Sequence, residues 1–138
     1  MRVIVIGGPR AGKSTYAKQS GLPHYCTDPK SLVKEPIDGV TYLPEGLKWS
    51  EDSDYILSKW FSKPGDWIIE GVGAVRALRK WSLVHKHANP CDEIVVIHDN
   101  HPSVTMLDGQ LAMQKGVMKI WGEVRSRYED ITKNIKAK

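Results

Sequence analysis

The stretch Gly7-Gly8-Pro9-Arg10-Ala11-Gly12-Lys13-Ser14 fills every required position of the pattern G-x-x-x-x-G-K-[ST], which holds nucleotide phosphates. The β-branched, apolar run from Arg2 to Ile6 precedes it and predicts a buried strand, and the residues after Ser14 predict a helix. A glycine-rich turn between a strand and a helix directs backbone N–H groups and the positive helix end towards one anion. Because strand, loop and helix occur together, we favour a phosphate site over a glycine-rich turn that arose by chance.

The loop also predicts the cofactors. Within it, we expect the Lys13 ammonium to reach the β- and γ-phosphates and the Ser14 hydroxyl to bind Mg²⁺. ATP and Mg²⁺ are therefore the expected ligands. The residues that we expect to bind the nucleotide are Gly8, Pro9, Arg10, Ala11, Gly12, Lys13, Ser14 and Thr15.

Length and composition favour one compact domain over residues 1–138, since 41% of the 138 residues are hydrophobic and 26% are charged. No apolar run approaches the roughly 18 to 20 residues that cross a bilayer, and the first strand leaves no room for a signal peptide after Met1. We therefore expect a cytoplasmic protein without a membrane partner. The lone cysteines, Cys26 and Cys91, lack a C-x-x-C spacing and predict free thiols in place of a disulfide or a metal site.

The net charge of +4 is unevenly distributed along the chain. From Lys115 to Lys138 there are seven basic and three acidic residues, whereas the segment 35–54 has six acidic residues and only Lys48 as a base. A basic end could attract polyphosphate or nucleic acid. We favour an ordinary solvated helix face over such a binding surface, because the bases are mixed with acids.

Apolar runs and turn residues alternate along the rest of the chain. They predict further strands over 24–27, 67–69 and 93–97, and helices from an N-cap at Ser50 to Phe61, over 74–84, and over 117–135. The segment 30–48, rich in proline and glycine, predicts an irregular or partly extended excursion. Strands joined by helical crossovers favour an α/β fold of three layers, with a mostly parallel, four- to five-stranded sheet and helices on both faces.

Three carboxylates lie at or just past the ends of predicted strands, namely Asp28, Glu70 and Asp99. In a parallel sheet, these ends meet at one edge, which is also the edge of the phosphate loop. The sequence therefore predicts that acids far apart in the chain converge on one site. For Asp28 the alternative is ordinary turn chemistry of an Asp-Pro pair.

The loop, Asp28 and the stretch Trp67-Ile68-Ile69-Glu70-Gly71-Val72-Gly73-Ala74-Val75-Arg76 together resemble P-loop kinases of the nucleotide and small-molecule type, a group that includes adenylate, shikimate and polynucleotide kinases. The chain is also similar to small P-loop proteins of phage genomes. That similarity implies no particular activity. The kinase resemblance implies that Asp28 orients or deprotonates the acceptor or positions Mg²⁺ through water. It also implies that Glu70 holds the Mg²⁺ shell and that Arg76 clamps the acceptor, with Arg79 as its substitute or either arginine simply solvated.

The chain departs from that kinase pattern at several points. It has Glu70 where many such kinases have aspartate, and one additional residue separates Arg76 from the Glu-Gly pair. The lid segment 107–116 offers Gln110, Gln114 and Lys115 but no arginine. Because the predicted last helix extends almost to the end of the chain, we also expect a fifth strand to be missing.

Two functions remain open on this basis. The first is an ATP-dependent kinase that acts on a nucleoside, a nucleotide or a nucleic-acid end, and the second is an ATPase or regulatory nucleotide-binding module that acts on a protein or nucleic-acid partner. Trp49 lies in the irregular segment and is a candidate for stacking an acceptor base. The histidines lack the spacing of a transition-metal site, so we expect surface or hydrogen-bonded side chains.

Overall fold

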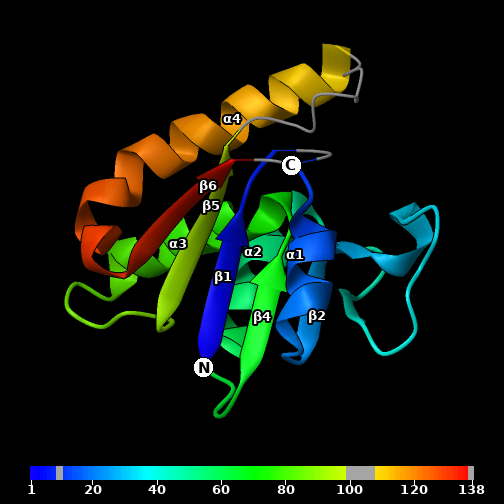
Figure 1. Ribbon diagram of the computed structural model, residues 1–138, viewed down its shortest axis with the longest axis horizontal. Helices are drawn as coiled ribbons and strands as arrows, with labels where there is room; N and C mark the ends of the chain where they lie inside the picture. The colour runs from blue at the N-terminus through cyan, green and yellow to red at the C-terminus, as the bar shows by residue number, and fades with distance from the viewer. Residues whose placement is uncertain (9–10, 99–107, 137–138) are drawn as a thin grey trace.

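The computed structural model describes residues 1–8, 11–98 and 108–136. The strands of these residues are β1 (Arg2–Ile6), β2 (His24–Pro29), β3 (Thr41–Leu43), β4 (Trp67–Glu70), β5 (Glu93–His98) and β6 (Thr132–Lys136). They form a six-stranded sheet in the order β3-β2-β4-β1-β5-β6, and every neighbouring pair is parallel (Figure 1). The carboxyl ends of the strands therefore meet at one edge of the sheet.

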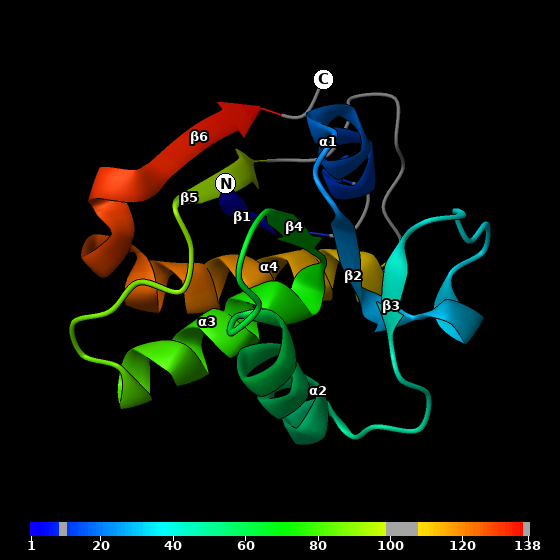
Figure 2. The ribbon, with the colours of Figure 1, turned by 90° about the horizontal axis from the view of Figure 1, so that it is seen from below.

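Helices cover both faces of this sheet, as predicted. The helix α1 (Lys13–Ser20) lies on one face, and α2 (Trp49–Tyr55), α3 (Val72–Val84) and α4 (Asp108–Val124) lie on the other (Figure 2). A π-helical turn, Ile56–Trp60, continues α2. The protein is thus an α/β structure whose central layer is the sheet.

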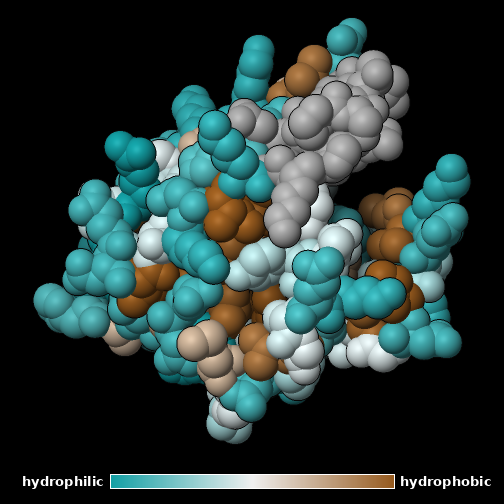
Figure 3. Space-filling model, viewed as in Figure 1, coloured by the Kyte–Doolittle hydropathy of each residue, from teal (hydrophilic) through white to brown (hydrophobic). Residues whose placement is uncertain are grey.

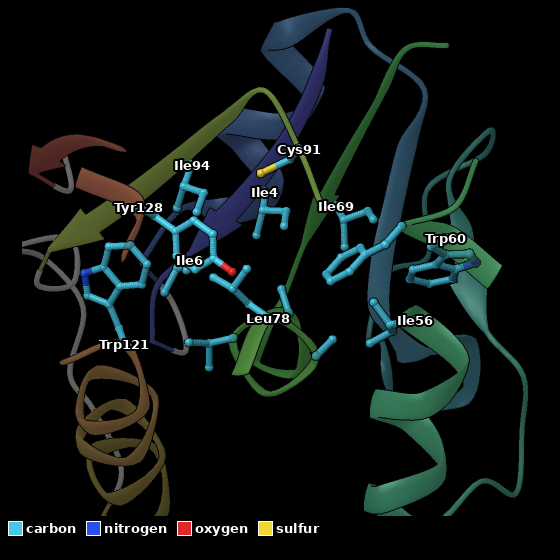
Figure 4. Packing of buried hydrophobic residues seen from close by; sticks show 14 of the residues in the cluster. Ile4, Ile6, Ile56, Trp60, Ile69, Leu78, Cys91, Ile94, Trp121 and Tyr128 are labelled. Carbon is cyan, nitrogen blue, oxygen red and sulfur yellow. The ribbon is translucent and has the colours of Figure 1, made fainter. Parts of the chain in front are cut away.

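Alternating side chains of the strands supply two hydrophobic cores. Ile4, Ile6, Ile69 and Ile94 face α3 and α4, where they join Leu78, Trp121 and Tyr128 in the larger core (Figure 4). The intervening residues, among them Val5, Ile68 and Val95, join Ala17 of α1 in the smaller core. This parity places every second residue of β2 and β4 on the side of α1.

Two of the strands lie where the sequence predicted none. β3 interrupts the segment predicted to be irregular and pairs with β2 at the edge of the sheet. β6 lies within the residues predicted to continue the last helix, and it pairs with β5. The prediction of four to five strands was therefore too low, and the prediction that a fifth strand is missing was wrong.

The last predicted helix breaks because of its tertiary contacts. α4 ends at Val124, and a 3-10 helix, Arg125–Ile131, follows with a non-helical conformation at Tyr128 (φ −112°, ψ 16°). The Tyr128 side chain is buried, and its hydroxyl lies 2.6 Å from the Ser82 hydroxyl of α3. Ile131 and Ile135 have a helical spacing, but they lie on opposite faces of the sheet, Ile131 against the larger core and Ile135 against the smaller core. Their four-residue spacing misled the prediction.

The other helix starts differ from the prediction by a few residues. α2 begins at Trp49, and the Lys48 backbone N–H donates to the Glu51 side chain over 2.9 Å, so Ser50 is not the N-cap. α3 begins at Val72 because Gly71 makes the turn directly after β4, with φ at 129°. The Glu70 side chain therefore sits immediately before a helix.

The surface on the side of α1 is mostly hydrophilic, with hydrophobic residues in separate patches (Figure 3). Leu32 and Ile37, between β2 and β3, are among the exposed hydrophobic side chains. No helix in the described part of the chain is long and apolar enough to span a membrane. Cys26 and Cys91 are buried free thiols, as predicted, and burial raises the pKa of each to about 12.

Gly71 is the glycine on which the turn after β4 depends most. A Cβ at this position would lie 1.9 Å from Thr27 Oγ1, which also accepts a hydrogen bond from the Gly73 N–H over 3.1 Å. We predict that Gly71→Ala lowers the free energy of unfolding by at least about 2 kcal/mol, from backbone strain and this clash. Urea unfolding measures the change.

Gly116 of α4 provides the control, because a Cβ there would meet no atom within 4 Å. Gly116→Ala should raise the free energy of unfolding by up to about 1 kcal/mol, since alanine is the better helix former. Equal effects of the two substitutions would contradict the role given to Gly71.

Candidate functional site

The phosphate loop connects the carboxyl end of β1 to the first turn of α1. Gly12 takes a left-handed conformation (φ 94°) immediately before Lys13, the first residue of α1. The Lys13 side chain is buried, and its Nζ donates to the Gly8 carbonyl over 2.5 Å. Among the predicted ligands, Gly8 accepts the hydrogen bond from Lys13, Ala11 is buried, and Gly12, Ser14 and Thr15 line a cavity together with Lys13. The predicted ligands Pro9 and Arg10 lie outside the described residues.

A row of polar side chains on β2 and β4 faces the same side of the sheet as α1. Along β2, His24, Cys26 and Asp28 alternate with residues that face α3, such as Thr27. Glu70 ends β4 directly beside Cys26 in the parallel register. The alternation of the strands therefore carries these side chains towards Lys13 and Ser14.

Glu70 joins the loop to the two strands. Its Oε2 atom accepts a hydrogen bond from Ser14 Oγ over 2.7 Å and lies 2.8 Å from His24 Nε2. Glu70 is only 2% exposed and His24 only 8%, so this carboxylate has exchanged water for two protein donors. Such an arrangement holds an acid in one orientation next to the phosphate loop.

A cavity of about 400 Å³ opens over these groups. It brings together four separate parts of the chain: the loop and α1, the end of β2, the end of β4 with the turn after it, and α4. Its lining consists of Gly12, Lys13, Ser14, Thr15, Asp28, Glu70, Gly71, Val72 and Met113. Asp28 and Glu70 thus converge with the loop as predicted, whereas Asp99 lies outside the described residues.

The charged groups of the cavity perturb one another. Burial lowers the pKa of Lys13, and the carboxylates of Glu70 and Asp28 oppose this effect. Burial and the neighbouring Glu70 carboxylate raise the pKa of Asp28, against the attraction of Lys13. Asp28 therefore holds a proton more tightly than an exposed aspartate does.

The oxygen atoms in this cavity are of the kind that Mg²⁺ binds. Among the described residues, no cluster of three or more acidic, histidine or cysteine side chains could hold a metal ion alone. Mg²⁺ in nucleotide sites commonly takes one or two protein oxygens and completes its shell with phosphate and water. The Ser14 hydroxyl and the Glu70 carboxylate fit that requirement.

Arg76 lies one helical turn beyond Val72, which lines the cavity. Its guanidinium stacks 3.8 Å from the centre of the Trp49 ring, and Trp49 is 64% exposed. Burial lowers the pKa of Arg76, with a further contribution from Arg79, while Asp52 opposes both. The starts of α2 and α3 therefore place a cation against an exposed aromatic side chain, one helical turn beyond the lining of the cavity.

The remaining predicted site residues lie elsewhere. Arg79 points to α4, where its Nη1 lies 3.4 Å from Glu123. Gln110 and Lys115 belong to α4 and do not line the cavity, which Met113 of the same helix does. Gln114 covers the loop, since a Cβ on Gly8 would lie 2.6 Å from its Cγ.

Sequence reasoning missed the contribution of His24 and of Met113. The signal for His24 was its position two and four residues before Cys26 and Asp28, which places all three on one face of a strand. The other described histidines fit the prediction of surface or hydrogen-bonded side chains. His85 stacks on Trp81, and His98 Nε2 lies 2.7 Å from Asn134 Oδ1.

Comparison of the chain with protein-family models, curated proteins and solved structures gives no match. Function has therefore to be inferred from the residues of the cavity. They comprise part of the glycine-rich loop after β1, an acid hydrogen-bonded to Ser14 of that loop, and a second acid of raised proton affinity.

The raised pKa of Asp28 predicts a stability penalty at neutral pH. Because the folded-state pKa of Asp28 lies above its unfolded value, the protonated carboxyl favours the folded state. This stabilisation is fully present below the unfolded pKa and is lost as the pH rises through the folded pKa. We predict that Asp28→Asn raises the melting temperature at pH 7 and that the gain shrinks as the pH falls, to be least below the unfolded-state pKa of about 4, where the carboxyl is protonated as well.

Thermal unfolding over this pH range tests the prediction. Asp130→Asn, at an exposed acid, is the matched control and should leave the melting temperature nearly unchanged. An Asp28→Asn variant that is less stable than the original chain at pH 7 would show that the carboxylate stabilises the fold.

Proposed function

We propose that the protein is a small Mg²⁺- and ATP-dependent kinase of the P-loop type. It transfers the γ-phosphate to a hydroxyl or phosphate of a nucleoside, a nucleotide or a nucleic-acid end. The observation that carries the proposal is the hydrogen bond from Ser14 to the buried Glu70, in a cavity that also holds Lys13 and Asp28. A three-layer P-loop fold belongs to the same proposal, supported by the loop after β1 and by the flanking of β1 by β4 and β5.

The loop supplies the phosphate site. Backbone N–H groups between Ala11 and Thr15 and the start of α1 favour an anion above the loop. Lys13 Nζ, which donates to Gly8 in the present structure, would turn to the phosphate oxygens and stabilise the charge that moves during transfer. The low exposure of Lys13 strengthens this interaction, because little water competes for it.

Ser14 and Glu70 would hold Mg²⁺ beside the phosphates. A bound Mg²⁺ would supply positive charge that offsets the negative charge of the phosphates. Glu70 orients the Ser14 hydroxyl through their hydrogen bond. Its carboxylate, like that of Asp28, also supplies negative charge next to Lys13.

Asp28 is the residue that would accept the acceptor's proton. As the acceptor oxygen bonds to the γ-phosphorus, its hydrogen passes to the Asp28 carboxylate, and the bond from the γ-phosphorus to the bridging oxygen breaks to release ADP. Burial and the neighbouring Glu70 raise the pKa of Asp28, which favours this transfer. Its place in the lining of the same cavity as Lys13 and Ser14 fits the role.

Arg76 and Trp49 would contact the acceptor. The guanidinium offers paired donors to a phosphate, and the exposed Trp49 ring offers a surface on which a base can stack. Arg76 lies one helical turn beyond Val72 of the cavity lining, and the Trp49 ring stacks on its guanidinium. We call these two side chains the acceptor wall, because they would position the acceptor.

One observation favours the second function, an ATPase or regulatory module. No arginine is found among the described residues that line the cavity, and the α4 side chains nearest the loop are Met113 and Gln114. Kinases of this type commonly use lid arginines to stabilise the transferring phosphate. Slow hydrolysis without an acceptor would fit such a site.

Incubation with γ-labelled ATP distinguishes the two functions. We predict label on at least one member of a panel of nucleosides, nucleotides and 5′-hydroxyl oligonucleotides. Asp28→Asn should lower the rate of transfer by at least about a hundredfold while preserving ATP affinity. Release of labelled inorganic phosphate with no labelled acceptor would contradict the kinase and favour the ATPase.

A second experiment tests the acceptor wall. Arg76→Ala should raise the KM for the acceptor by about tenfold or more, from the loss of a charged hydrogen-bond donor, and leave the KM for ATP unchanged. Arg79→Ala is the matched control, since Arg79 is one turn away and pairs with Glu123. Equal effects of the two variants would remove Arg76 from the acceptor site.

A further inference from the structure

His24 is a buried histidine that lies behind the proposed metal-binding acid. Its Nε2 atom lies 2.8 Å from Glu70 Oε2, and both side chains are almost inaccessible to water. The same oxygen accepts the hydrogen bond from Ser14 Oγ. His24, Glu70 and Ser14 thus form a continuous chain from the start of β2 to the phosphate loop.

The position of His24 separates it from the ligand. His24 is opposite Ile68 in the parallel register, two residues before Glu70 along β4, and it does not line the cavity. It therefore approaches Glu70 from the amino end of the strand, whereas the cavity opens at the carboxyl end. A contact with nucleotide or Mg²⁺ through Glu70 is the one route by which His24 could act on either.

The chemistry of Glu70 gives this contact a purpose. A buried carboxylate accepts hydrogen bonds only, so its orientation is determined by the donors around it. Ser14 belongs to the loop, and its hydroxyl would contact Mg²⁺ in addition to its hydrogen bond to Glu70. The imidazole N–H of His24, fixed in the sheet, is the donor that stays in place when a nucleotide binds.

We infer that His24 is a positioning residue that holds the Glu70 carboxylate in the orientation needed for Mg²⁺-dependent nucleotide binding. This role rests on the proposed function and adds to it a residue that contacts the metal-binding acid and not the metal ion itself. In metalloproteins, replacing a residue that hydrogen-bonds to a metal ligand typically lowers metal affinity or activity by roughly 10- to 100-fold. The effect should appear in the Mg²⁺-dependent part of nucleotide affinity and not in the Mg²⁺-independent part.

Two substitutions of similar polarity test the inference. The amide nitrogen of His24→Gln reaches the position of Nε2, whereas that of His24→Asn is too short and falls near Nδ1. For each variant, calorimetry gives the ATP affinity with Mg²⁺ and with EDTA, and the ratio is the gain due to Mg²⁺. We expect His24→Gln to keep the gain within about threefold and His24→Asn to lose about tenfold or more.

The combination with Glu70→Gln shows whether His24 acts through Glu70. In that background, His24→Asn should cause no further loss, because the carboxylate it positions is gone. A merely structural role of His24 would instead lower the affinity with and without Mg²⁺ together. Melting temperatures of all variants confirm that each is folded at the temperature of the titration.

The outcomes distinguish this inference from the proposed function. If the original chain gains no affinity from Mg²⁺, both the proposed function and the role of His24 fail. If the original chain shows the gain and His24→Asn retains it, only the role of His24 is overturned. A loss in His24→Asn that His24→Gln restores supports both.

Discussion

The hydrogen bonds around the Glu70 carboxylate tie together three parts of the protein that are far apart in sequence. Ser14 brings the phosphate loop, His24 brings the start of β2, and Glu70 itself ends β4 at the centre of the sheet. A carboxylate at 2% exposure is costly unless donors replace water. Both donors depend on the parallel register of β2, β4 and β1, so the site and the fold require the same arrangement of strands.

The sheet provides this arrangement through the parity of its strands. On the side of α1, most of the inward positions of β1, β4 and β5 are apolar, whereas β2 presents His24, Cys26 and Asp28 in succession. A polar row in an otherwise apolar layer lowers the stability of the fold, and the raised pKa of Asp28 shows part of that cost. The side facing α3 and α4 instead carries the larger core and stabilises the molecule (Figure 4).

Sequence reasoning predicted the central strands and the convergence of Asp28 and Glu70 on the loop, because local patterns determine these features. β-branched runs identify buried strands, and parallel strands bring their carboxyl ends together. It failed where tertiary contacts decide. Ile131 and Ile135 have a helical spacing, but Tyr128 anchors a turn on α3 and β6 pairs with β5. The contact between His24 and Glu70 depends on a register that one strand's sequence does not contain.

The most direct test of the account is the map of backbone amide shifts when Mg²⁺ and a non-hydrolysable ATP analogue are added to the protein. The account predicts that the largest shifts fall on residues 11–15 and on Glu70, Gly71 and Val72. Among the described residues, a second cavity of similar volume, about 400 Å³, lies between α4 and the strands β5 and β6, and His98, Trp121 and Asn134 are among its lining residues. Shifts confined to that second cavity, or no shifts at all, would contradict the claim that the loop after β1 and Glu70 form the nucleotide site.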